Sequence, residues 1–133
     1  MKKVLVVSYY WPPSGGAGVQ RWLKLSKYLV QLGVEVHVLT VDPKHASYMA
    51  IDPSLEKDVH AQVQVHKTKS FEIINQYAKL FGKKKVPTAG FSNVDNSKWS
   101  QKLINFIRSN FFIPDPRIGW KKYAVRKGLE IIK

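Results

Sequence analysis

The fold is decided by residues 4–22, which read VLVVSYYWPPSGGAGVQRW. Residues 4–7 are a continuous β-branched and aliphatic run, which is typical of a parallel strand that is covered on both faces. The prolines at 12 and 13 supply no N–H group to a ladder, so they end the strand. A glycine loop (residues 12–18) follows, in which Gly15, Gly16 and Gly18 allow a tight turn and a close approach to a ligand.

A helix is predicted to begin after this loop, because residues 19–32 repeat with the period of a helix. One face is predicted to hold Val19, Trp22, Leu23, Ser26, Leu29 and Val30. Gly33 follows where a left-handed residue would end the helix. The free N–H groups and positive dipole of the first turn, with Arg21 beside them, suit an anion such as phosphate. Gln20 is a candidate to hydrogen-bond a ligand hydroxyl.

A second strand is predicted at residues 34–41, where valines alternate with other side chains. Together the three segments form a β-α-β unit, in which the two strands are parallel. Ligands of such sheets bind in the crevice at the carboxyl ends of the strands, where the glycine loop lies. The sequence therefore predicts an α/β fold with a Rossmann-like parallel sheet flanked by helices.

Residues 9–43 resemble the opening of bacterial glycosyltransferases that have two facing Rossmann-like domains (the GT-B fold) and belong to the retaining family 4 type. In that family a Gly-Gly pair after the first strand faces the phosphates of the nucleotide-sugar, and Gly15 and Gly16 match this pair. Residues 111–120 (FFIPDPRIGW) are similar to a segment of polysaccharide-type members. The resemblance is dense only over the first 43 residues.

The resemblance implies an enzyme that moves a sugar from a nucleotide-sugar donor to a glycan or lipid-linked acceptor with retention of configuration. It implies no metal and no cofactor, since the nucleotide-sugar is a substrate. Most donor-binding residues of the family, including its paired glutamates, lie in a second domain. We therefore expect residues 1–133 to be a truncated N-terminal, acceptor-side domain that is inactive alone, with the donor-binding domain absent.

A third strand is predicted at residues 59–67, which alternate with a period of two. A helical insertion is predicted at about 70–113, with helices at 71–81 and 97–111. Its candidate membrane contacts are Lys83, Lys84, Lys85 and Trp99. The alternative is that both helices only pack on the sheet or on each other.

A further helix is predicted to begin near Gly119 and to carry Trp120, Tyr123, Ala124 and Ile131. Before it, Asp115 and Arg117 lie on a proline-braced loop and are candidates for the acceptor side of the cleft. An Asp–Arg ion pair that fixes the turn is the alternative. Trp120 could stack on a sugar ring or pack in the core.

The net charge of +13, from 22 Lys and Arg against 9 Asp and Glu, favours anionic partners. We expect no nucleic acid, since no recognised binding motif is present. There is no cysteine, and the histidines lack the spacing of a metal site. No segment reaches the roughly 20 apolar residues that span a bilayer, so we expect a cytoplasmic protein, peripheral on the inner face of the plasma membrane where it meets lipid.

Two other classes of protein remain open. In a dinucleotide-binding oxidoreductase domain, Asp42 would bind the ribose at the end of the second strand. The glycines do not have the G-x-G-x-x-G spacing of such a domain, however, and no P-loop lysine follows them. A non-catalytic basic module for membranes or nucleic acid is the other alternative.

Overall fold

The computed structural model of the chain describes residues 2–71 and 117–133. The chain forms two compact units, Met1–Phe71 with Trp120–Lys133 and Glu72–Gly119, and the first is described below. The predicted helices at 71–81 and 97–111 lie outside the described residues, except for Phe71. So do the candidate residues Lys83, Lys84, Lys85, Trp99 and Asp115.

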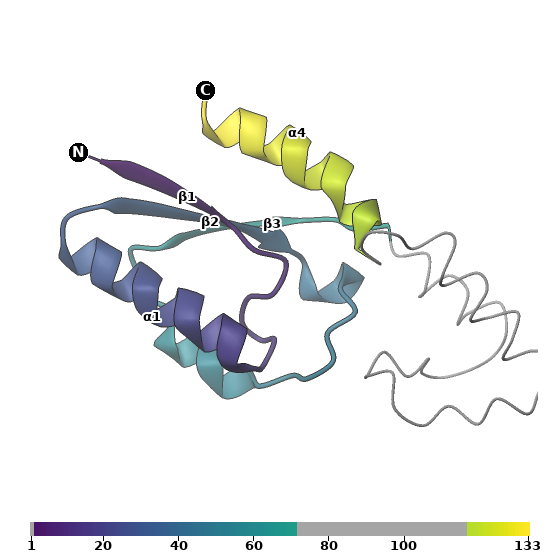
Figure 1. The fold of residues 1–133 in the computed structure, drawn as a ribbon, viewed down its shortest axis with the longest axis horizontal. Coiled ribbons are helices and arrows are strands. Elements are labelled where there is room, and N and C mark those ends of the chain that lie inside the picture. Colours follow the sequence, from purple (N-terminus) through teal and green to yellow (C-terminus); the bar gives the residue numbers. More distant parts are fainter. Residues whose placement is uncertain (1, 72–116) are drawn as a thin grey trace, which may run out of the picture. The chain divides into compact units, whose positions relative to one another are not determined.

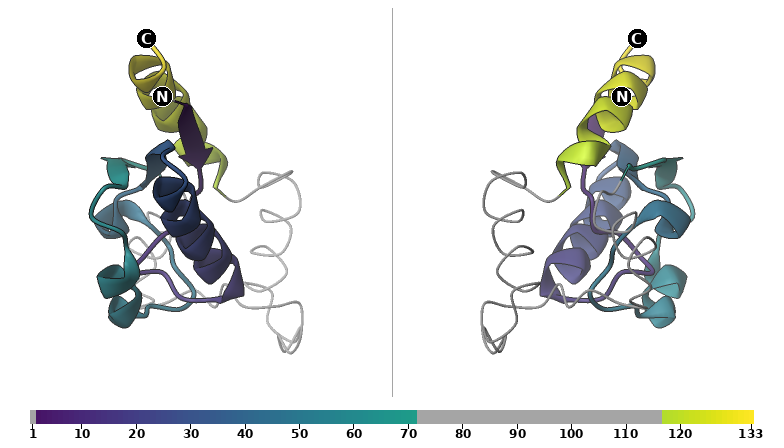
Figure 2. Two further views of the ribbon diagram at one scale, coloured as in Figure 1. Left: turned by 90° about the vertical axis from the view of Figure 1, so that its left-hand side faces the viewer. Right: turned by 90° about the vertical axis from the view of Figure 1, so that its right-hand side faces the viewer.

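The described part of the chain confirms an α/β fold. Three parallel strands lie in the order β1 (Lys3–Val7), β2 (Glu35–Val41) and β3 (Gln64–Thr68). Helix α1 (Ala17–Gln31) covers one face of this sheet and α4 (Lys121–Ile131) covers the other (Figures 1 and 2). Short 3-10 helices connect them: η1 (Pro43–His45), η2 (Pro53–Asp58) and η3 (Ile118–Trp120).

Strand β2 lies between two apolar cores, because its side chains alternate between the two faces of the sheet. The core under α1 contains Val6, Trp11, Val19, Leu23, Val36, Val38, Leu55 and Val63. The core under α4 contains Tyr9, Leu39, Val41, Trp120 and Ala124. The central position of β2 explains why Val36, Val38, Leu39 and Val41 are each at most 1% exposed.

Helix α1 ends as the sequence predicts. Gly33 has a φ of 76°, and its N–H donates to the carbonyl of Val30 at 2.9 Å. The N–H of Val34 donates to the carbonyl of Leu29 at 3.0 Å, which completes a Schellman motif. The prediction is wrong for one member of the apolar face: Trp22 is 40% exposed and lies on the flank of the helix. The helix packs on the sheet along the narrower line of Val19, Leu23 and Ser26.

Strand β3 is shorter than predicted. The predicted strand began at residue 59, but residues 59–63 form a turn in which the N–H of Val63 donates to the carbonyl of His60 at 3.0 Å. The cause is η2, which is capped by Asp52 and runs from Pro53 to Asp58. The chain must still turn after Asp58 before it can enter the sheet. The period of two persists only in the buried Val63 and the half-buried Val65.

Strand β1 is less covered than its apolar run predicts, because Val6 is buried but Val7 is 57% exposed. Among the described residues, β1 has a neighbouring strand on one side only. The N–H of Ser8 donates to Leu39 and the carbonyl of Lys2 accepts from Glu35. Because backbone groups alternate between the two sides of a strand, the N–H groups of Leu5 and Val7 point to the open side.

Amide hydrogen exchange can test this open edge. We expect the amides of Leu5 and Val7 to exchange much faster than those of Val4 and Val6, which point toward β2. The comparison is internal to one strand, so global unfolding affects both sets equally. Equal protection of the four amides would contradict the prediction and would mean that another segment covers β1.

Candidate functional site

The candidate site lies where the three strands end. Strand β1 leads into the glycine loop, β2 leads into η1, and β3 ends at Thr68. Because the strands are parallel, these three segments lie at the same edge of the sheet, next to the beginning of α1 (Figure 1). This is the edge at which open α/β sheets bind ligands.

Residues 50–52 brace the glycine loop from the side. The N–H of Gly15 donates to the carbonyl of Ala50 at 3.0 Å, and the N–H of Asp52 donates to the carbonyl of Pro13 at 2.7 Å. A Cβ atom on Gly15 would meet the Cβ of Ala50 at 3.4 Å and that of Asp52 at 3.5 Å. Gly15 therefore serves the packing of the loop, and its N–H is not available to a phosphate.

Gly16 has a different role, because it is the N-cap of α1. Its φ of 111° and ψ of 160° lie in a region that side-chain-bearing residues rarely adopt. It provides no side-chain cap, and a Cβ atom at Gly16 or at Gly18 would meet nothing within 4 Å. The N–H groups of Ala17 and Gly18 have no acceptor inside the helix, since they belong to its first turn. The beginning of α1 is thus open to an anion.

The two polar candidates near the beginning of α1, Gln20 and Arg21, are both exposed. The N–H of Gln20 donates to the carbonyl of Gly16 at 3.3 Å inside the helix, so only its exposed side chain could contact a ligand. No acidic residue lies in the first turn of α1. The positive end of the helix dipole and the Arg21 guanidinium therefore add to one another in attracting an anion.

An aromatic cluster of Tyr9, Tyr10, Tyr48 and Trp120 lies at the same edge, on the α4 face. Tyr9 meets Tyr10, Trp120 and Tyr48 edge to face, with ring centroids 5.1, 5.5 and 6.1 Å apart. The Tyr9 hydroxyl accepts from the N–H of Ser47 at 3.0 Å. Burial raises the pKa of Tyr48 to about 12, so its hydroxyl stays protonated and donates to the carbonyl of Val41 at 3.4 Å.

Of the two roles considered for Trp120, stacking on a sugar ring or packing in the core, the structure shows core packing. It is 9% exposed, and its indole N–H donates to Thr68 Oγ1 at 2.8 Å. The ring therefore fastens the beginning of α4 to the end of β3. Arg117 is half-buried and belongs to the other compact unit, so it is not placed relative to this edge.

Asp42, the ribose ligand of the oxidoreductase alternative, is at the end of β2. Its Oδ1 accepts from the N–H of Lys44 at 2.9 Å and so caps η1. Within residues 2–71 and 117–133, no three His, Cys, Asp or Glu side chains are arranged so that they could hold a metal ion. None of the helices described is both long enough and apolar enough to cross a membrane.

Comparison with protein-family models, curated proteins and solved structures finds no match to this chain.

Sequence reasoning missed three groups of residues that form contacts at this edge or within the sheet. They are the 50–52 brace, the aromatic cluster, and a contact between His37 and His66. Residues 52–54 read Asp-Pro-Ser, a combination typical of both turns and helix starts, and Asp52 Oδ1 accepts from the N–H of Ser54 at 3.1 Å. Nothing in the local pattern indicated that this turn returns to the glycine loop.

Proposed function

We propose that the chain is the acceptor-side part of a glycosyltransferase, which transfers a sugar from a nucleotide-sugar donor to a glycan or lipid-linked acceptor with retention of configuration. The observation that carries the proposal is the open N-terminus of α1, which begins at Gly16 without a side-chain cap. The resemblance of residues 9–43 to retaining glycosyltransferases supports the same assignment.

The chemistry that suits this site is the stabilisation of a leaving diphosphate. When the bond between the sugar and the nucleotide breaks, negative charge develops on the phosphate oxygens. Preorganised N–H groups and positive charge stabilise such a transition state more than the ground state. The backbone of Ala17 and Gly18 supplies the N–H groups, and Arg21 supplies the charge. No metal is needed for this role, and the nucleotide-sugar is substrate.

We also propose that the enzyme works in the cytoplasm, peripheral on the inner face of the membrane. The support is the net charge of +13, together with the basic and aromatic residues Lys83, Lys84, Lys85 and Trp99. A lipid-linked acceptor would be reached at such a surface. We propose no nucleic-acid partner.

A charge placed at Gly18 tests the phosphate site. Gly18 is the second residue of α1 and has open space around it, so Gly18→Asp should fold at least as stably as the wild type. A carboxylate in the first turn interacts favourably with the dipole, and loss of glycine favours the helix by about 0.5 kcal/mol. The same carboxylate repels phosphate. We therefore expect a more stable protein that binds diphosphates about tenfold more weakly, which corresponds to roughly 1.4 kcal/mol.

The matched control is Gly18→Ala, which removes the glycine without adding charge. Binding of UDP, GDP, ADP and inorganic pyrophosphate would be followed by the amide NMR signals of residues 16–18. We expect Gly18→Ala to bind as the wild type does. Equal binding by Gly18→Asp would contradict the site, and preferential binding of NADH over every diphosphate would favour the oxidoreductase alternative.

A further inference from the structure

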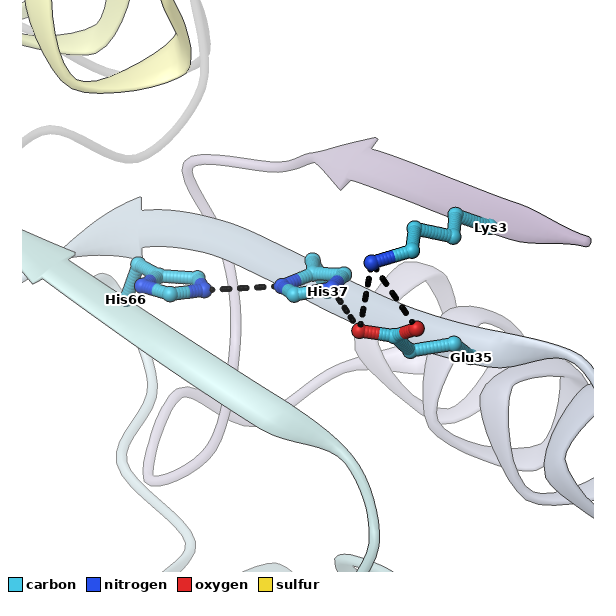
Figure 3. Close-up of polar contacts among 4 residues, drawn as sticks. All are labelled: Lys3, Glu35, His37 and His66. Atoms are coloured by element: carbon cyan, nitrogen blue, oxygen red, sulfur yellow. Dashed lines mark hydrogen bonds and ion pairs between the residues drawn. The ribbon is translucent and has the colours of Figure 1, made fainter. Parts of the chain in front are cut away.

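Four polar side chains form a continuous chain across the sheet on its α4 face (Figure 3). Lys3 Nζ lies 3.1 Å from Glu35 Oε2, and Glu35 Oε1 lies 2.9 Å from His37 Nε2. His37 Nδ1 lies 3.1 Å from His66 Nε2, with the two rings nearly parallel. This polar chain joins β1, β2 and β3 through their side chains.

The chemistry of the polar chain fixes where its protons lie. Hydrogen bonds from His37 and Lys3 hold the pKa of Glu35 below its usual value, so this side chain is a carboxylate that only accepts. His37 Nε2 must therefore carry a proton, which makes Nδ1 of the neutral ring an acceptor. His66 Nε2 must then be the donor. When both rings are neutral, both imidazoles are therefore in the Nε2–H form, and His66 Nδ1 is left as a lone-pair nitrogen.

The pair can take up one proton without losing its hydrogen bond. A proton from solvent adds to His66 Nδ1, and the proton on His66 Nε2 moves to His37 Nδ1. His37 is then the cation, next to the Glu35 carboxylate, and its Nδ1–H donates to His66 Nε2. The number of hydrogen bonds in the polar chain is unchanged.

A second proton breaks the contact. When both rings are cationic, His37 Nδ1–H and His66 Nε2–H are two donors that face one another at 3.1 Å. The only carboxylate in the polar chain, Glu35, lies on the far side of His37. Lys127 of α4 adds a further positive charge toward His66. Burial, the His37 charge and Lys127 together lower the pKa of His66.

We propose that the His37–His66 pair is a proton-sensitive link between β2 and β3, which holds β3 and α4 on the sheet and opens when both rings are protonated. Strand β3 has one neighbouring strand, β2, among the described residues, so its backbone ladder from Gln64 to Thr68 and its side-chain contacts hold it without a second strand. Helix α4 packs on both β2 and β3. Two residues beyond His66, Thr68 holds Trp120, so opening of β3 also frees the beginning of α4.

The direction of the pH effect follows from the lowered pKa of His66. In the open state His66 takes up a proton near the ordinary histidine pKa of 6.5, whereas in the closed state its lowered pKa delays this uptake to a lower pH. Below pH 6.5 the closed state therefore binds fewer protons at His66 than the open state does. Acidification below this value therefore favours opening, while pH 7 and above favours the link. The Glu35 carboxylate affects stability in a different pH range. Because its pKa is lowered in the folded chain, the stability that it contributes is lost only as the pH falls below 4.5, the ordinary pKa of a glutamate.

Amide hydrogen exchange of β3 between pH 7.5 and 5.0, corrected for intrinsic rates, tests the link. In the wild type we expect the opening of β3 to increase as the pH falls, by about tenfold for each unit by which the pKa of His66 is lowered. In His66→Gln the side-chain amide can still donate to His37 but does not titrate, so this dependence on pH should disappear. His45→Gln, which changes an exposed histidine, should behave as the wild type does. The same pH dependence in His66→Gln and the wild type would overturn the proposal.

A second measurement needs only the wild-type chain. Nitrogen-15 NMR of the four histidine rings at pH 7.5 should show the Nε2–H form for both His37 and His66. On acidification, the first proton should appear as a charge on His37 and a change of His66 to the Nδ1–H form. Independent titration of the two rings, as expected for separate exposed histidines, would overturn the proposal even if every variant failed to fold.

Discussion

Trp120→Ala is expected to destabilise the protein by about 3–5 kcal/mol, which is the usual cost of removing a buried tryptophan side chain. The indole ring is 9% exposed, contacts Tyr9 edge to face and donates to Thr68. Alanine would leave a cavity in the core under α4 and would remove the hydrogen bond that joins η3 to the end of β3. Chemical denaturation monitored by circular dichroism would measure the change in the free energy of unfolding.

Two further variants separate the contributions to this loss. Trp120→Phe keeps an aromatic ring but lacks the N–H group, so it should cost less than the alanine variant, with about 1 kcal/mol from the lost hydrogen bond. Trp22→Ala, at a ring that is 40% exposed, should cost clearly less than Trp120→Ala. If both tryptophans were equally dispensable for stability, Trp120 would not be a core residue and the sugar-stacking alternative would return.

Leu23→Ala is expected to cost about 2–5 kcal/mol, because Leu23 is 1% exposed in the core under α1. The matched control is Leu32→Ala at the end of the same helix, where the side chain is 79% exposed and the cost should stay within about 0.5 kcal/mol. Urea denaturation of the two variants measures both values. Similar costs for both would contradict the orientation of α1 described here.

The features that sequence predicts well are those that depend on neighbours along the chain. The end of α1 at Gly33 follows from a glycine placed directly after a helical repeat, and the structure confirms it. The helix after Gly119 likewise packs Trp120, Tyr123, Ala124 and Ile131 against the core, as its period predicts. In both cases one local rule is sufficient.

The features that sequence could not predict depend on how distant segments meet. His37 and His66 are 29 positions apart, and their contact requires the register that places Leu39 beside His66. A period of two shows which residues share a face of one strand, but it does not fix the register between strands. The roles of Gly15 and Gly16 also look alike in the sequence. They differ because Ala50 and Asp52 pack against Gly15, whereas Gly16 has a φ of 111° and is the N-cap of α1.

The brace between the glycine loop and residues 50–52 has a consequence for the thermodynamics of binding. A loop that must become ordered around a ligand spends part of the binding free energy on lost conformational entropy. Here the bridge between Ser14 and Ile51, with the hydrogen bonds beside it, already fixes the chain just before Gly16. A ligand at the beginning of α1 would therefore meet preorganised N–H groups. Its affinity would depend mainly on charge and shape, and calorimetry should show little of the entropy loss that accompanies loop ordering.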